Sequence, residues 1–165
     1  MSSLSQGIHN AICIGIIYIG TQPSIYKGLP KVTLIWEVYE NDNSKLFSRD
    51  YTYSYHEKAI LRLHLESWRG RPFTKDELAK FKLRNILGVP CKLEIKKNSK
   101  NYKQVENVFR FPANEQAPQR KSGLIYFDIA DETTYSFIPS IPPYIVEKIK
   151  NSPEYKSSRL CKINE

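Results

Sequence analysis

The side chains best suited to chemistry in this sequence are arginines that stand beside aromatic residues. The clearest case is residues 67–74, where Trp68 is followed by Arg69 and Arg71. A guanidinium group can hold two phosphate oxygens and stack on the face of a base, and an indole ring offers a further stacking surface. The segment therefore suggests contact with a nucleic acid. The alternative is that Trp68 lies in the core, while the arginines cap helix carbonyls or remain in water.

A second group of rings with an arginine follows an alternating pattern over residues 45–53. Phe47, Arg49, Tyr51 and Tyr53 would share one face of a strand. Such a face can stack bases and hold a phosphate, as a single-strand binder requires. The same residues can instead cover the core of a β-barrel, because tyrosine tolerates either environment. The sequence leaves these two interpretations open.

Further rings and cations complete the candidate contacts. Tyr26 and Lys27 lie in a stretch over residues 20–30 that glycines and prolines break into a loop. Lys92 and Lys96 fall on the polar side of an alternating segment. The full set of candidate nucleic-acid-binding residues is Tyr26, Lys27, Phe47, Arg49, Tyr51, Tyr53, Trp68, Arg69, Arg71, Lys92 and Lys96.

Residues suited to catalysis are sparse. The three histidines form no H-x-x-x-H pair, and the sequence has no G-x-S-x-G, Walker or dinucleotide-binding motif. One weak pattern is left, in which Glu94 and Lys96, with Asp76 or Glu77 upstream, would form a magnesium-dependent nuclease centre. A glutamate between lysines on a strand is more commonly a solvated ion-pair partner. We therefore expect no enzyme, no metal site and no cofactor, and the nuclease is the least favoured alternative.

The distribution of charge favours a polyanionic partner. The formal net charge is +8, from 25 Lys and Arg against 17 Asp and Glu. Residues 41–110 hold 16 of the basic and 8 of the acidic residues, while the two flanking regions are balanced. A local basic excess attracts nucleic acid directly and through the release of counterions. A basic surface that serves only solubility is the alternative.

Cysteine usage and hydropathy bear on location. Cys13, Cys91 and Cys161 are far apart and form no C-x-x-C pair, so we expect free thiols in a reducing compartment. The apolar run over residues 11–20 is too short to span a bilayer, and no Lys or Arg precedes it as in a secretory signal. We expect a cytoplasmic protein with no membrane partner, and its 41% apolar content can fill a core.

The elements that must position these side chains are mainly strands. Predicted strands cover residues 11–19, 31–40, 45–53, 91–97 and 102–111. Gly15 interrupts the first, β-branched run, which predicts a long strand with a bulge or a bend. The second run alternates most clearly, with Val32, Leu34, Trp36 and Val38 toward one face.

Two helices are predicted between the third and the fourth strand. Ser54 and Glu57 match a capping box, so the first helix should begin near residue 55 and end at Gly70. Thr74 and Glu77 match a second capping box, which predicts a shorter helix. The first helix carries one apolar stripe, made of Leu61, Leu65 and Trp68.

This order of strands and helices predicts a mainly β fold. Three strands, a helical connection and two strands are the order of an OB-fold, a five-stranded barrel whose second and third strands and adjoining loops bind single strands. We expect residues 8–111 to form such a domain, although an α+β sandwich would give the same order. Residues 112–165 should supply a polar linker, a short strand over 124–129 and a helix over 144–150. This extension would pack on the barrel or on the partner subunit of a homo-oligomer.

The middle of the chain also resembles a known family. The resemblance covers about residues 11–112, and residues 67–74 are its most specific part. The other residues that carry it are Trp36, Glu37, Tyr51, Thr52, Tyr53, Ser54, Leu65, Glu66, Glu77, Leu78, Phe81, Leu87, Gly88 and Cys91. This pattern resembles small bacteriophage and prophage proteins that are described as replication or recombination accessories related to single-stranded DNA-binding proteins.

The resemblance implies an OB-like fold and action in DNA replication or recombination inside a bacterial host cell, beside a phage recombinase or helicase. The acidic tail of bacterial single-strand binders is missing, since residues 157–165 are basic to neutral. Residues and resemblance together predict a single-stranded DNA-binding protein without sequence preference. The alternative is an accessory that docks on a phage replication or recombination protein without touching DNA.

Overall fold

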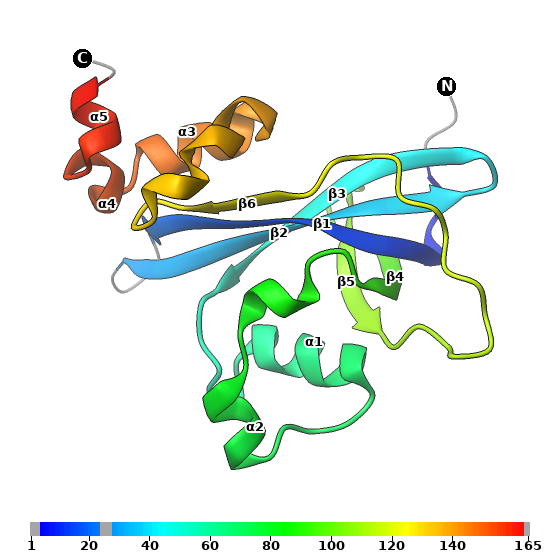
Figure 1. Ribbon diagram of the computed structural model, residues 1–165. Coiled ribbons are helices and arrows are strands. Elements are labelled where there is room, and N and C mark those ends of the chain that lie inside the picture. The colour runs from blue at the N-terminus through cyan, green and yellow to red at the C-terminus, as the bar shows by residue number, and fades with distance from the viewer. Residues whose placement is uncertain (1–3, 24–27, 164–165) are drawn as a thin grey trace.

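The chain folds around one mainly antiparallel sheet. The computed structural model describes residues 4–23 and 28–163, and it has a six-stranded sheet in the order β3-β2-β1-β4-β5, with β6 paired to β1 in parallel (Figure 1). The strands are β1 (Gly7–Gln22), β2 (Leu29–Glu40), β3 (Asn43–Thr52), β4 (Pro90–Lys97), β5 (Lys103–Phe109) and β6 (Ile125–Asp128). The prediction of a mainly β protein is confirmed, and all the predicted strands are present.

Helices cover both faces of this sheet, as Figure 1 shows. On one face lie α1 (Ile60–Arg69), α2 (Lys75–Lys80) and the short 3-10 helix η1 (Leu83–Ile86). On the other face lie the 3-10 helix η2 (Glu132–Ser140), α3 (Pro143–Lys150), α4 (Pro153–Lys156) and α5 (Arg159–Ile163). Each face therefore has its own hydrophobic core.

Strand β1 is central because it is apolar on both faces, as a strand covered on both sides must be. It pairs with β2 over most of its length, with β4 in its first half and with β6 in its second half. The pairing with β2 shifts register between Cys13 and Gly15, so the predicted bulge is confirmed. A Cβ at Gly15 would lie 3.0 Å from Ile35 Cδ1, which explains why the bulge carries a glycine.

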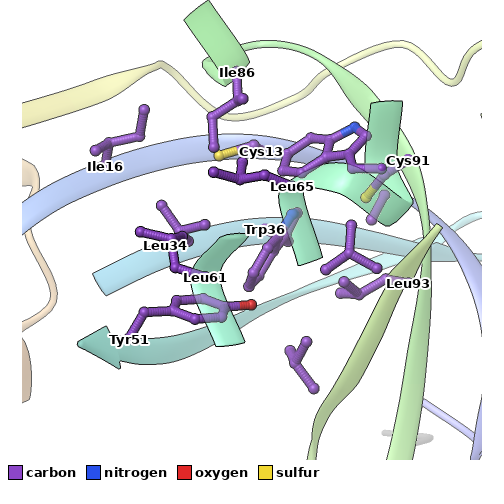
Figure 2. Packing of buried hydrophobic residues seen from close by; sticks show 14 of the residues in the cluster. Cys13, Ile16, Leu34, Trp36, Tyr51, Leu61, Leu65, Ile86, Cys91 and Leu93 are labelled. Atoms are coloured by element: carbon purple, nitrogen blue, oxygen red, sulfur yellow. The ribbon is translucent and has the colours of Figure 1, made fainter. Parts of the chain in front are cut away.

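The first core lies between the sheet and α1 (Figure 2). The alternation predicted for β2 is confirmed, because Val32, Leu34, Trp36 and Val38 all point into this core. The apolar stripe of α1 packs against them, with Leu61, Leu65 and Trp68 buried. The inward side of β4 adds Cys91, Leu93 and Ile95.

The two helices beside the first core differ in how well their ends could be predicted. Helix α1 begins at Ile60, because Ser54 Oγ accepts from the His56 N–H at 3.1 Å in a turn instead of capping a helix. The predicted start near residue 55 is therefore wrong. Gly70 ends α1 in the left-handed conformation at φ 82°, as predicted. The second capping box is confirmed, since Thr74 and Glu77 exchange both hydrogen bonds at the start of α2.

The second core lies between the sheet and the C-terminal segment. The short strand and the last helix predicted there are present as β6 and α3, while η2, α4 and α5 were not predicted. The segment packs on the sheet of its own chain, where Ile145, Ile149 and Phe127 contact the outer side of β1. Lys148 Nζ also forms an ion pair with Asp50 Oδ2 on β3 at 2.5 Å.

The sheet does not close into a barrel in the described residues, because no ladder joins β3 to β5. A side chain crosses this seam instead. The Arg49 guanidinium crosses it and donates to the Val105 carbonyl on β5 at 2.8 Å. The neighbouring Tyr51 hydroxyl bonds to the helix that covers the sheet, 2.7 Å from His64 Nδ1 on α1. The predicted closed five-stranded barrel is therefore not confirmed.

The cysteines form no disulfide, and Cys13 and Cys91 are buried. Burial raises the pKa of the Cys13 thiol to about 12 and that of Cys91 well above its ordinary value. Both thiols stay protonated at neutral pH, so they act as small apolar core residues. Within residues 4–23 and 28–163, no helix is long and apolar enough to cross a bilayer.

Candidate nucleic-acid interface

Two of the predicted stacking residues lie in the core. Tyr51 is only 2% exposed, its hydroxyl hydrogen-bonds His64, and its ring packs edge-on against Trp36. Trp68 is buried, and its indole N–H donates to the Pro90 carbonyl at 2.9 Å. Neither ring is accessible to a base in this conformation. The core interpretation that the sequence left open is the one that their burial supports.

The arginines after Trp68 hold the connection between α1 and α2. Arg69 Nη2 lies 2.5 Å from Glu77 Oε2, and its guanidinium stacks over Phe73 at 4.3 Å from the ring centroid. Arg71 Nη2 reaches the same Glu77 oxygen at 3.1 Å, while its side chain is 69% exposed. The hydrogen bond from Arg69 contributes most to lowering the pKa of Glu77, to about 2. Arg69 is therefore a structural group, and Arg71 still presents charge to solvent.

The remaining predicted residues are spread over the molecule. Phe47 is half-buried against the first core, and Arg49 is engaged with β5. Lys92 lies 2.6 Å from both Asn10 Oδ1 and Glu115 Oε2, whereas Lys96 is exposed on the same strand. Tyr26 and Lys27 lie outside the described residues. The predicted cations therefore do not share one groove.

A different set of rings does come together, and we call it the aromatic row. It runs from β6 through β1 and the end of β3 to the segment after α2. Successive ring centroids are 6.1 Å apart for Tyr126 and Tyr18, 5.2 Å for Tyr18 and Tyr53, 5.6 Å for Tyr53 and Tyr55, and 5.7 Å for Tyr55 and Phe81. Tyr53 is 40% exposed and the other rings are half-buried. The row therefore presents aromatic surface to solvent, centred on Tyr53.

Cations flank the aromatic row. The Arg84 guanidinium stacks over Tyr126 at 4.4 Å from the ring centroid. Lys82, next to Phe81 in the chain, is exposed and forms no ion pair with any residue that the structure describes. Rings of this kind with a cation beside each end can hold bases and phosphates together.

The partly buried setting of the aromatic row favours neutral phenol groups. Burial is the largest cause that raises the pKa of Tyr18, Tyr55 and Tyr126. Tyr18, Tyr55 and Tyr126 therefore carry no phenolate charge near neutral pH that would repel a polyanion.

Of the aromatic row, only Tyr53 was among the predicted contacts. Tyr55 could have been found, since residues 51, 53 and 55 are tyrosines that continue the alternation of β3 past its end. Tyr18 and Tyr126 could not have been found, because they are far apart in the sequence and only the parallel pairing of β1 with β6 brings them together. No local pattern in the sequence predicts the pairing of these two strands.

Two hollows lie close to this surface. An apolar groove of about 490 Å³ runs beside α2, and its walls include Trp68, Phe73 and Phe81. A polar cavity of about 550 Å³ lies at the outer end of β3, lined in part by Lys31 and Arg49. Arg69 lines the first hollow and Arg49 the second, whereas Arg71, Lys92 and Lys96 line neither.

The glutamates of the possible nuclease centre form hydrogen bonds and ion pairs with neighbouring side chains. Glu94 Oε1 accepts from the Asn107 amide at 2.8 Å and Glu94 Oε2 lies 3.8 Å from Lys96 Nζ, while Glu77 is held by Arg69. In the part of the chain that the structure describes, no three His, Cys, Asp or Glu side chains are grouped to hold a metal ion.

Similarity to known proteins gives no information about the function of this chain. Comparison of the chain with protein-family models, with curated proteins and with solved structures finds no match. Function is therefore inferred from the surface described above.

Proposed function

We propose that this protein binds single-stranded DNA without sequence preference and without catalysis. Bases stack on the aromatic row, chiefly on Tyr53, while Arg84 and Lys82 contact phosphates. The observation that carries this proposal is the continuous row of rings with an exposed centre, flanked by a stacked arginine and an exposed lysine. Stacking on rings suits every base, and phosphate contacts are blind to sequence.

The arrangement of strands supports an OB-like fold for residues 8–111. Three strands in a β3-β2-β1 meander, a helical connection and β4-β5 have the order of that fold, and Arg49 bridges the seam where a barrel would close. OB-folds bind single strands on strands 2 and 3 and the adjoining loops. Tyr53 directly follows β3, and its N–H donates to the Pro30 carbonyl at 2.9 Å. Tyr26 and Lys27, which lie outside the described residues, remain proposed contacts.

The proposed setting follows from the same properties. The basic excess in residues 41–110 favours a nucleic acid over a neutral ligand. Free cysteines suit the reducing cytoplasm of a bacterial host cell. The proposed process is phage-type DNA replication or recombination, with a recombinase or helicase as protein partner.

Titration with labelled oligothymidine at rising salt tests the proposal. About three to five phosphate contacts should lower the logarithm of the affinity with a slope of about −2 to −4 against the logarithm of salt concentration, at about 0.7 per contact. Affinity for a duplex of the same length should be weaker. A flat salt dependence, or a preference for duplex, would contradict the proposal.

A pair of tyrosine variants locates the binding surface. Tyr53→Ala should weaken oligothymidine binding by about 1–3 kcal/mol, because one stacked base loses its ring. Tyr144→Ala is the matched control, since Tyr144 is also exposed but lies on α3 beyond the opposite face of the sheet. Equal effects of the two changes would mean that the aromatic row is not the binding surface.

A further inference from the structure

The apolar groove beside α2 is a second candidate site, distinct in chemistry from the aromatic row. Its walls are mostly carbon: Leu65, Trp68, Phe73, Phe81, Ile86 and Val89. The one polar group of Trp68 is already used, because its N–H donates to Pro90. The groove therefore favours the burial of apolar side chains.

The groove continues past Val89 into a neighbouring hollow of about 400 Å³. The two share Trp68, Arg69 and Val89, and the second is walled by Phe111 and Pro112 from the segment after β5. Val89 stands at the junction and is 36% exposed. The combined groove is elongated, which fits an extended stretch of chain better than a compact small molecule.

Positive charge dominates the rim of the combined groove. Lys80 and Arg110 line it, together with Arg69, whose charge is already paired with Glu77. The two acidic side chains along it are already paired, Glu77 with the guanidinium groups of Arg69 and Arg71, and Glu115 with Lys92. Lys80 forms no ion pair with the residues that the structure describes. An occupant with negative charge is therefore favoured over a neutral or basic one.

We infer that this groove binds an acidic segment of a partner protein whose large apolar side chains pack on Phe81 and Val89. A nucleobase fits the apolar walls less well, because the ring nitrogens and exocyclic groups that it buries against them would lose their hydrogen bonds to water. Apolar side chains carry no such cost, and neighbouring carboxylates can reach Lys80 and Arg110. The inference does not depend on DNA binding.

Binding of the purified full chain to a random-peptide array tests this assignment. The bound peptides should be enriched in aspartate and glutamate together with leucine, phenylalanine or tryptophan. One bound peptide is then resynthesised in three forms for titration: unchanged, with its acids replaced by lysine, and with its apolar residues replaced by serine. Both replacements should weaken binding at least about tenfold, a change of about 1.4 kcal/mol.

Three variants tie the binding to the groove. Val89→Asp places a carboxylate at the junction, and Lys80→Glu reverses a rim charge, so each should lower peptide affinity at least about tenfold. Lys75→Glu makes the same charge change on the same helix, α2, but Lys75 does not line the groove, and its affinity should stay within about twofold. Tyr53→Ala should leave peptide binding unchanged, which separates this test from that of DNA binding.

Several results would overturn the inference. Bound peptides with the composition of the array, or enriched in basic residues, would contradict the acidic partner. Peptide binding that survives both Val89→Asp and Lys80→Glu would place the peptide elsewhere. Loss of oligothymidine binding in Val89→Asp would instead make the groove a base subsite, and loss of self-association in that variant would make its occupant a second copy of this chain.

Discussion

The two faces of the sheet differ in how completely other parts of the chain cover them. On the face toward α1, the first core ends in half-buried rings and in an open apolar groove. On the opposite face, the C-terminal segment covers the second core, and a hollow among Phe127, Ile149 and Tyr155 measures only about 30 Å³. The first face can accept a ligand, while the second is already filled by the protein's own chain.

Polar contacts hold the C-terminal segment, here called the cover, in place over the second core. The buried Glu37 carboxylate accepts from the Lys121 N–H at 2.8 Å and from the Ser122 hydroxyl, both in the segment that leads to β6. Glu154 on α4 accepts from the Thr21 N–H at 2.8 Å. Such satisfied contacts specify one position for the cover, whereas an apolar contact alone would allow it to slide. The difference teaches that the C-terminal segment is part of the scaffold.

A matched pair of phenylalanine changes gives the largest expected contrast between the faces. Phe127→Ala empties the second core, where the ring is fully buried, and should lower the free energy of unfolding by about 3–5 kcal/mol. Phe81→Ala removes a half-buried ring at the edge of the first core and should cost about 1–2 kcal/mol. Urea unfolding measures both. Equal losses would mean that the edge of the first core is as closed as the second core.

The fold was largely predictable where local pattern and burial agree. The alternation of β2 and the capping box of α2 depend on near neighbours, and both are confirmed. The start of α1 was misplaced because Ser54 has two local uses, and the turn to His56 is the one adopted. The parallel pairing of β6 with β1 could not be predicted, since it depends on a contact between distant segments.

The candidate site was less predictable than the fold for a related reason. Rings and cations are visible in the sequence, but their exposure depends on packing across the sheet. Tyr51 and Tyr53 share one side of their strand, yet α1 covers the first and leaves the second at the edge. For Arg69 the sequence leaves a ligand contact and a structural role open, and the structure pairs it with Glu77, which its own helix cap holds in place.

Glu37→Gln tests whether polar contacts hold the cover of the second face. The amide replaces one accepting oxygen by a donor among the Tyr39 hydroxyl, the Ser122 hydroxyl and the Lys121 N–H, so a buried donor is left unpaired. We expect a loss of about 2–3 kcal/mol in the free energy of unfolding. Faster amide hydrogen exchange in β6 should accompany it. Glu40→Gln is the control, because Glu40 bonds exposed Ser5, and it should change little.

As the pH falls, groups on the face of the sheet toward α1 should lose their contribution to stability before groups on the opposite face. Burial, helped by the Arg49 charge, lowers the pKa of His64 to about 4 from its ordinary 6.5, so the folded state holds the neutral ring. The unfolded chain therefore binds a proton first as the pH falls. Stability is fully present above pH 6.5 and falls toward pH 4, by about 2 kcal/mol after allowance for solvent screening.

Urea unfolding at intervals between pH 7 and pH 4 measures this loss. His64→Gln keeps a hydrogen-bond acceptor for Tyr51 but cannot titrate, so its stability should be nearly flat down to pH 5. Glu37 and Glu154, on the second face, have pKa values lowered by the hydrogen bonds that they accept, and their contributions are lost only at lower pH. If His64→Gln keeps the full dependence of unfolding free energy on pH above pH 5, His64 is not the source of that dependence.

The smallest expected effect separates two ion pairs of the C-terminal segment. Lys148 pairs with Asp50 on β3 at 2.5 Å and so joins the cover to the sheet, whereas Arg159 lies 3.6 Å from Glu132 within the cover and both side chains are largely exposed. A double-mutant cycle with Lys148→Ala and Asp50→Asn should give a coupling of about 0.5–1 kcal/mol. The cycle for Arg159 and Glu132 should give about zero, because solvent and salt screen that pair. If the two couplings were equal, the ion pair to β3 would add nothing to the attachment of the cover, and buried groups such as Glu37 would have to account for it.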